Sequence, residues 1–234
     1  RTEDPRLLTG RGRYVSDTTL VDLAFGYTVR SPHAHAHILS IDTAAAKAAP
    51  GVLAVYTYAD VVAQGLGRTG THFPPRTRPD GSPDYDRPHP GLVGDTVRCI
   101  GDPVAFVVAE SINQAKHAAE LVTIAYEPLP TVVATARATD PASPQIWADF
   151  PDNISNISDI GDKAAVDAAF SAASQVISER FVINRISPNP IETRGCVGAY
   201  SVEDNRFTLY GDTQSPHFTR RQLAESVFQI PETR

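Results

Sequence analysis

Gln214 is the first candidate functional residue of this sequence. Its side chain is a neutral amide, and it stands directly before a predicted helix. Residues 207–212 alternate apolar and polar side chains, which is the period of a β-strand. Ser215 is a good N-cap residue, and Pro216 suits the first helical position because its missing N–H costs nothing there. We therefore expect Gln214 in a strand-to-helix turn beside the positive end of a helix, which favours an anionic group. The alternative is that Gln214 only caps this turn.

Three histidines at alternate positions form a second candidate site. On a strand, His33, His35 and His37 would all point to one face, and three imidazoles on one face can hold zinc. A metal-binding histidine normally has a carboxylate or a carbonyl behind it, and the neighbouring sequence offers no carboxylate for that role. Surface or interface histidines are therefore the favoured interpretation.

Glu192 and Arg194 are a third candidate pair. A carboxylate and a guanidinium can serve as a general acid and an anion clamp. Their spacing of two residues would place both on the same side of a strand, so a structural ion pair is at least as good an interpretation. No Ser-His-Asp or Cys-His nucleophile set stands out, and no glycine-rich phosphate loop follows a predicted strand.

Cys99 and Cys196 are the only two cysteines of the chain. Two thiols are too few for an iron–sulfur cluster or a closed zinc site. A disulfide between them would need oxidising surroundings, and two buried free thiols are the simpler interpretation.

The composition excludes several classes of partner. The chain has 234 residues, 41% hydrophobic content and a formal net charge of −6, so it can bury a sizeable core in one or two domains. The negative charge argues against nucleic acid or an anionic membrane surface. No apolar run approaches the roughly 20 residues that a membrane helix needs. A cytoplasmic location is expected, with the periplasm not excluded. The lack of methionine, even at position 1, suggests that the chain begins inside a longer product. We expect a natural split subunit or a proteolytic piece.

The elements that must position these residues alternate between strands and helices. Ser111 and Gln114 form a capping-box pattern before one of the helices. We expect strands near residues 22–29, 52–57, 104–109, 123–126, 175–186 and 207–212. We expect helices near residues 43–50, 112–122, 162–173 and from 216 onward. Together with the antiparallel-type hairpins, this order predicts an α+β fold.

Two long segments lack any such period. Residues 65–91 are rich in proline and glycine, and we expect a solvated surface loop there, or a loop that contacts another subunit. Residues 128–159 carry Pro, Ser, Asp and Asn with the single tryptophan. We expect a connector on the surface, where proteases would cut first.

Several stretches resemble the molybdenum-binding large subunits of the xanthine dehydrogenase, aldehyde oxidase and carbon monoxide dehydrogenase family. At the C-terminal end these are PNPIETRGCVGAY at residues 188–200 and GDTQSPHFTRRQLAESVFQIPE at residues 211–232. Earlier stretches are RTEDPRLLTGRGRYVSD, VRSPHAHAHILSID, PGVLAVYTYAD, VRCIGDPVAFVVAES and AAELVTIAYEPLP. The resemblance covers nearly the whole chain in the family's order. It departs at Ile191, where methionine or leucine is more usual, and at His37, where arginine is common.

The resemblance implies an α/β hammerhead domain at residues 1–130, a connector at 131–160 and the N-terminal part of a molybdopterin-binding domain at 161–234. It also implies a molybdenum–pterin cofactor, as molybdopterin or its cytosine dinucleotide. Gln214 would donate a hydrogen bond to the metal's oxo ligand, while the catalytic glutamate and most cofactor loops would lie beyond Arg234. [2Fe–2S] and FAD subunits would be partners, together with the remaining molybdopterin-binding portion of the large subunit.

The implied activity is that of a molybdenum hydroxylase, an oxidoreductase that acts on an aldehyde, an N-heteroaromatic or a similar small substrate with water-derived oxygen. The cofactor carries the hard chemistry in such enzymes, so the isolated chain is expected to be inactive and metal-free. Two alternatives stay open: a non-catalytic assembly module and a free-standing small-molecule binder. The sequence does not reveal the substrate.

Overall fold

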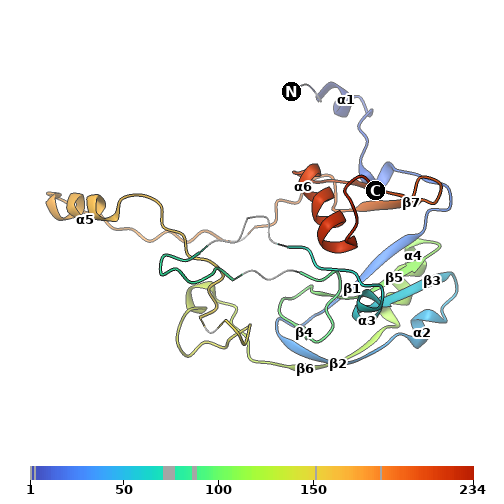
Figure 1. Cartoon of the computed structure of the whole chain (residues 1–234), viewed down its shortest axis with the longest axis horizontal. Helices are drawn as coiled ribbons and strands as arrows, with labels where there is room; N and C mark the ends of the chain where they lie inside the picture. The colour runs from blue at the N-terminus through green and yellow to red at the C-terminus, as the bar shows by residue number, and fades with distance from the viewer. Residues whose placement is uncertain (1, 3, 71–76, 86–88, 151, 185) are drawn as a thin grey trace.

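The computed structural model describes residues 2, 4–70, 77–85, 89–150, 152–184 and 186–234. Its main body contains two three-stranded sheets, and a hairpin with a helix follows near the C-terminus (Figure 1). This combination confirms the predicted α+β class.

The first sheet is antiparallel, with the strand order β1 (Phe25–Arg30), β5 (Pro103–Ala109) and β3 (Val52–Thr57). Helix α4 (Ile112–Glu120) packs on one face of this sheet, beside the short helix α2 (Ala44–Lys47). The helices present small side chains, Ala46, Ala115 and Ala118, to Val55 and Val107 of the strands. Alanine allows the helix backbone to approach the sheet closely, so this core is tight although its residues are small.

The N-terminus of α4 follows the predicted capping pattern in part. The Ser111 hydroxyl accepts a hydrogen bond from the Gln114 backbone N–H at 3.3 Å. The Ser111 hydroxyl also lies 2.6 Å from Gln114 Oε1. The predicted N-cap is therefore confirmed, but the predicted capping box is not closed, because Gln114 Oε1 accepts from the Ser111 hydroxyl and not from the Ser111 N–H.

The second sheet has the order β4 (Thr96–Val97), β2 (Ala36–Asp42) and β6 (Thr123–Pro128), again antiparallel. Its core contains Ala36 and Val97 together with Val104, which belongs to β5 of the first sheet. Because one β5 residue enters the core of the second sheet, the two sheets are held together by a shared apolar contact.

The remaining helices are short. Before the connector lie α1 (Asp4–Leu8), the 3₁₀ turn η1 (Val15–Asp17) and α3 (Tyr58–Ala63). The connector carries the 3₁₀ turn η2 (Thr135–Arg137). Helix α5 (Lys163–Ala172) begins where it was predicted, with Asp162 accepting a hydrogen bond from the Ala165 N–H at 3.0 Å. It stands on an extended arm far from the sheets (Figure 1), and none of its residues is buried.

The predicted strand at residues 175–186 is wrong. The described residues of this range, 175–184 and 186, form no strand, and their large side chains are exposed, with Phe181 at 84% and Ile183 at 92%. A strand exists only when another strand pairs with it, and no described part of the chain pairs with this segment. The β-favouring composition of residues 175–186 is therefore not sufficient to form a strand.

Beyond the arm, the chain forms the hairpin β7 (Cys196–Ser201) and β8 (Arg206–Gly211). Helix α6 (Pro216–Arg221) follows and continues without a break into the π-helical segment η3 (Gln222–Phe228). Within the described ranges, no helix combines the length and the apolar character that a membrane crossing requires.

Candidate functional site

Gln214 lies in the bend between β8 and α6, as the sequence predicted. The side chain of Ser215 makes no capping hydrogen bond, so that part of the prediction is wrong. Thr213 closes the turn instead: its hydroxyl accepts a hydrogen bond from the Ser215 N–H at 3.3 Å and lies 2.8 Å from the Thr219 hydroxyl. The turn is therefore held by Thr213 and leaves Gln214 free of that task.

The Gln214 side chain is exposed, and no described residue hydrogen-bonds to its amide. Its two N–H donors and its carbonyl oxygen are therefore available to a ligand. A neutral donor of this kind suits an oxygen acceptor.

The hairpin and the helix enclose a groove. Phe207 of β8 stacks on Phe228 of η3, with ring centroids 4.9 Å apart and ring planes at 14°, and Tyr200 lies 4.7 Å from Phe207. The groove has a volume of about 830 Å³. Its lining includes Thr213 and Pro216, the residues on either side of Gln214 and Ser215. The stacking of Phe207 on Phe228 fixes the C-terminal end of η3 against the hairpin.

The predicted loop at residues 65–91 is anchored at its start to this same helix. The Gly67 N–H donates to the Val227 carbonyl at 2.8 Å, and the Gly70 N–H donates to Gln222 Oε1 at 2.9 Å. The Gln229 side chain returns a hydrogen bond from Nε2 to the Gly65 carbonyl at 3.1 Å. Residues 65–70 therefore connect the sheet domain directly to η3.

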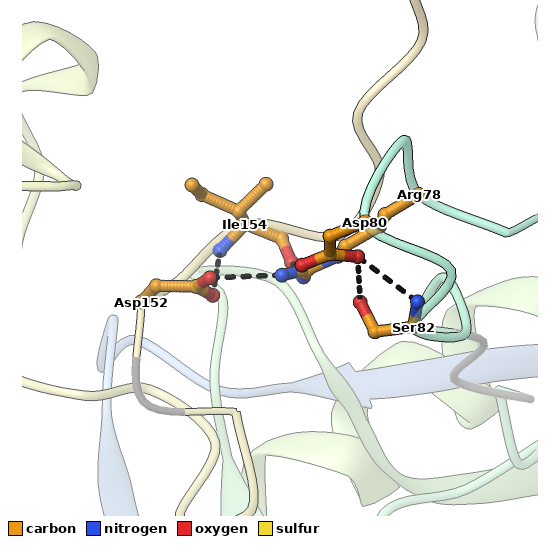
Figure 2. A network of polar contacts seen from close by, with 5 residues as sticks. All are labelled: Arg78, Asp80, Ser82, Asp152 and Ile154. Carbon is orange, nitrogen blue, oxygen red and sulfur yellow. Dashed lines mark hydrogen bonds and ion pairs between the residues drawn. The ribbon is translucent and has the colours of Figure 1, made fainter.

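A second part of the loop, residues 77–85, packs on the connector. Arg78 Nη1 donates to Asp152 Oδ2 at 2.9 Å, and Nη2 donates to the Ile154 carbonyl (Figure 2). The rings of Tyr85 and Phe150 lie 3.5 Å apart, and the Tyr85 N–H donates to the Ser155 carbonyl at 2.7 Å. Residues 71–76 and 86–88 lie outside the described residues. Many described residues of 65–91 are exposed, as expected of a surface loop, but residues 65–70 and 77–85 also contact later segments of the same chain.

The polar contacts in Figure 2 lower the pKa of two carboxyl groups. The Ile154 N–H and then the Arg78 guanidinium hold the pKa of Asp152 below its ordinary value, because both stabilise the ionised form. The hydroxyl and the N–H of Ser82 act in the same way on Asp80. Asp80 shapes its own turn, whereas Asp152 joins the loop to the connector.

The connector itself is ordered around Asn153. The Asn153 side chain accepts a hydrogen bond from the Ile146 N–H at 3.0 Å and donates to the carbonyls of Ala138 and Pro144, each at 2.9 Å. The guanidinium of Arg98 lies 4.0 Å from the centroid of the Trp147 ring, which ties the connector to the sheet domain. The connector is therefore on the surface, as expected, but it is fastened at several points.

The three histidines do not share a face. His35 is buried, with Nδ1 2.8 Å from the Pro130 carbonyl, and His37 Nδ1 lies 3.1 Å from the Thr96 hydroxyl. The His33 ring packs against Tyr126 at 4.8 Å. Strand β2 begins only at Ala36, so the alternation assumed from the sequence does not extend over all three residues. Over the described ranges, no cluster of His, Cys, Asp or Glu is arranged to hold a metal ion.

Glu192 and Arg194 also differ from the expectation. Both precede β7, and the described residues include no ion pair between them. Glu192 Oε1 accepts a hydrogen bond from the Val15 N–H at 2.8 Å, so it ties the N-terminal segment to the second part of the chain. Cys99 and Cys196 are free and exposed, so the expectation of buried thiols is wrong.

Two family matches cover this arrangement in order. Residues 9–130 match the family described as "Aldehyde oxidase and xanthine dehydrogenase, a/b hammerhead domain", and residues 146–234 match the "Molybdopterin cofactor-binding domain". The first match covers the two sheets and α4, and the second covers the hairpin, α6 and η3. The chain therefore belongs to the aldehyde oxidase and xanthine dehydrogenase family, which confirms the resemblance found in the sequence.

Individual relatives agree with this assignment. The chain is 38% identical to the carbon monoxide dehydrogenase large chain of Afipia carboxidovorans, over 99% of this chain and 29% of the relative. It is also 38% identical to the nicotine 6-hydroxylase large subunit of Paenarthrobacter nicotinovorans, over 96% of this chain and 26% of the relative. The crystal structure of quinoline 2-oxidoreductase from Pseudomonas putida 86 superposes with a TM-score of 0.84 at 35% identity, covering 100% of this chain and 28% of that one. The chain thus spans less than a third of the length of these proteins.

The donor set at Gln214 fits the cofactor that the second match implies. A pterin-bound molybdenum group presents oxygen acceptors. Gln214 presents an exposed amide to which no described residue hydrogen-bonds. A neutral amide gives hydrogen bonds without adding charge beside the metal. The residues present therefore suit a contact to the cofactor, while the described part of the chain offers no cluster for direct metal coordination.

Proposed function

We propose that this chain forms part of the molybdenum-cofactor subunit of a molybdenum hydroxylase, with Gln214 as its contact to the cofactor. The observation that carries the proposal is the exposed Gln214 amide, held by a turn that Thr213 closes, inside the region that matches the molybdopterin cofactor-binding domain. When bound, the molybdenum–pterin group would supply the redox chemistry that oxidises a small substrate with water-derived oxygen.

Gln214 would hold and orient the cofactor by donating from Nε2 to one of its oxygen atoms. Because the side chain carries no charge, its hydrogen bond can strengthen as negative charge develops on that oxygen without changing the net charge of the site. A preorganised donor of this kind is typically worth about 2–4 kcal/mol in a transition state. Gln214 therefore acts on the rate of the reaction more than on the stability of the fold.

The hammerhead domain would support this contact from outside the cofactor site. Residues 65–70 hold η3, and Glu192 binds the Val15 N–H, so the two parts of the chain are joined on both sides of the hairpin. We keep the division into a hammerhead domain at 1–130, a connector at 131–160 and the start of the cofactor domain at 161–234 as part of the proposal. The second family match begins at residue 146, inside that connector.

The proposed partners are the remaining molybdopterin-binding portion of the large subunit and the chains that carry [2Fe–2S] clusters and FAD. The names of the relatives support the first part, because they are a "large chain" and a "large subunit". The cofactor would be molybdopterin or its cytosine dinucleotide. The relatives are named for carbon monoxide, nicotine and quinoline, so their names favour no single substrate. The comparisons do not favour the alternatives of an assembly module or a free-standing binder.

Cofactor analysis of the assembled protein tests this function. The chain should be purified with the polypeptides that accompany it, and metal analysis should find about one molybdenum per chain, as one cofactor per subunit requires. Denaturation should release a pterin, and its mass would distinguish molybdopterin from the cytosine dinucleotide. An assembled protein that contains neither molybdenum nor pterin would contradict the proposal.

A further inference from the structure

The hydrogen bonds between residues 65–70 and the end of the α6–η3 helix use backbone groups and two glutamine side chains. The Gly67 N–H binds the Val227 carbonyl, the Gly70 N–H binds Gln222 Oε1, and Gln229 Nε2 binds the Gly65 carbonyl. These hydrogen bonds join segments that are more than 150 residues apart in the sequence. They therefore fix the position of one domain's helix from the other domain.

This contact requires glycine at position 67, because the approach leaves no space for a side chain. A Cβ atom on Gly67 would lie 1.9 Å from the Ser226 carbonyl oxygen and 3.0 Å from the Ser226 carbonyl carbon. Both atoms belong to the backbone of η3, so they cannot move aside as the end of a flexible side chain can. Gly67 does not adopt the left-handed backbone conformation, so the demand for glycine comes from the close approach alone.

The end of the helix explains why the contact is made here. The helix ends in a π-helical segment, and Gln229 closes it with a left-handed conformation at φ 55°. The last carbonyl groups of any helix lack partners within the helix. The Val227 carbonyl is one of them, and the Gly67 N–H satisfies it. Residues 65–70 thus act as the C-terminal cap of this helix.

The same helix carries Gln214 at its other end. Segments α6 and η3 are contiguous from Pro216 to Phe228, and the Gln214 bend directly precedes Pro216. A shift or rotation of η3 would therefore be transmitted along the helix to the Gln214 amide. Hydrogen bonds weaken steeply when the donor is misdirected, and a displacement of about 1 Å can cost as much as 100-fold in rate.

We propose that Gly67 and Gln222 are positioning residues that fix the direction of the Gln214 amide through the α6–η3 helix. This inference rests on the proposed function, because it concerns the contact between Gln214 and the cofactor. Gly67 acts by allowing the backbone approach, and Gln222 acts by receiving the Gly70 N–H. Neither residue contacts the cofactor in this account.

The test uses the assembled, cofactor-loaded enzyme and two independent readouts. Gly67→Ala forces η3 away from residues 65–70. Gly91→Ala is the matched control, because Gly91 lies in the same sequence excursion and a Cβ there meets nothing within 4 Å. Hydrogen–deuterium exchange of residues 212–221 reports the order of the helix without reference to activity. Turnover per bound molybdenum reports the effect on the reaction.

Gly67→Ala should raise exchange in residues 212–221 and lower kcat per molybdenum by about tenfold, with KM and molybdenum content unchanged. Gly91→Ala should match the wild type in all four quantities. Gln222→Ala removes the acceptor without creating a clash, and it takes the place of Gly67→Ala if that variant does not fold. Gln222→Glu retains an oxygen acceptor at the same distance and should restore kcat.

Three results would overturn the inference while leaving the proposed function intact. The first is exchange and turnover that equal those of Gly91→Ala. The second is raised exchange in residues 212–221 with unchanged turnover per molybdenum. The third is a loss of molybdenum and melting temperature in parallel with activity, which would mark a purely structural role. A wild-type enzyme without molybdenum would instead refute the proposed function, and this inference with it.

Discussion

Arg78 and Asp152 are joined by a 2.9 Å ion pair in which the guanidinium side chain is only 11% exposed and the carboxylate is 41% exposed. This pair fastens residues 77–85 to the connector. Because the Arg78 guanidinium also donates to the Ile154 carbonyl, the same side chain binds a carboxylate and the backbone two residues later. Of the contacts between residues 77–85 and the connector, this one therefore depends on the ionised state of Asp152.

Acidification should release this contact. The pKa of Asp152 is lowered from its ordinary value of 3.8 in the folded chain, first by the Ile154 N–H and then by Arg78. A carboxyl group with a lowered pKa stabilises the fold fully above its unfolded pKa, and this contribution is lost as the pH falls through the folded value. The fluorescence of Trp147, the only tryptophan of the chain, should therefore shift to the red below about pH 4.

Asp152→Asn should show the shifted Trp147 emission already at neutral pH and should lose most of the acid transition. Asp159→Asn changes an exposed carboxyl group outside this contact and should titrate like the wild type. An Asp152→Asn protein with the wild-type acid transition would show that the Arg78 contact does not hold the connector.

Two serines that look alike in the sequence should differ in their effect on stability. Ser111 caps α4 through its hydroxyl, whereas the Ser215 side chain makes no capping bond because Thr213 closes that turn. Ser111→Ala should lower the free energy of unfolding by about 1 kcal/mol, the usual cost of a lost N-cap. Ser215→Ala should change it by no more than a few tenths of a kcal/mol, which is typical of surface positions. Urea unfolding of both variants checks the difference, and equal losses would contradict the assignment of the two caps.

Limited proteolysis should cleave the exposed segment around Arg180 before it cleaves the connector. Arg180 lies in the exposed segment without regular structure, whereas Arg137 lies in η2 and pairs with Asp140 at 3.6 Å. Of these two sites in the purified chain, trypsin should therefore cleave first at Arg180. Mass spectrometry of the early fragments identifies the site. A first cut at Arg137 would restore the connector as the weakest segment, as the sequence alone suggested.

Local signals in the sequence were sufficient for many of the elements. The Ser111–Gln114 cap, the Asp162 cap and the position of Gln214 between β8 and α6 all depend on neighbours within a few residues. The predicted strand at 175–186 failed because pairing depends on another segment. Ser215 was mistaken for the functioning cap because Thr213 competes for the same turn.

The contacts between distant segments were beyond sequence reasoning. Nothing local relates Gly67 to Val227 or Arg78 to Asp152, because the fold alone brings these residues together. The one available signal was the repetition of glycine at 65, 67 and 70 inside the excursion, which is consistent with a close backbone approach. The position of Gln214 in the turn could be predicted from the sequence. Only the structure shows that Thr213, and not the Gln214 amide, closes the turn.

Replacement of Gln214 tests the central claim most directly. In the assembled enzyme, Gln214→Ala should lower turnover per bound molybdenum by about tenfold or more, because one preorganised donor is lost. Gln214→Glu keeps the size of the side chain but removes its N–H donors, so it should lose activity as well. Molybdenum content and melting temperature should stay near the wild-type values, and Gln64→Ala, which changes an exposed glutamine of the hammerhead domain, should have no effect. Unchanged turnover per molybdenum in Gln214→Ala, or a collapse of stability together with activity, would contradict the account.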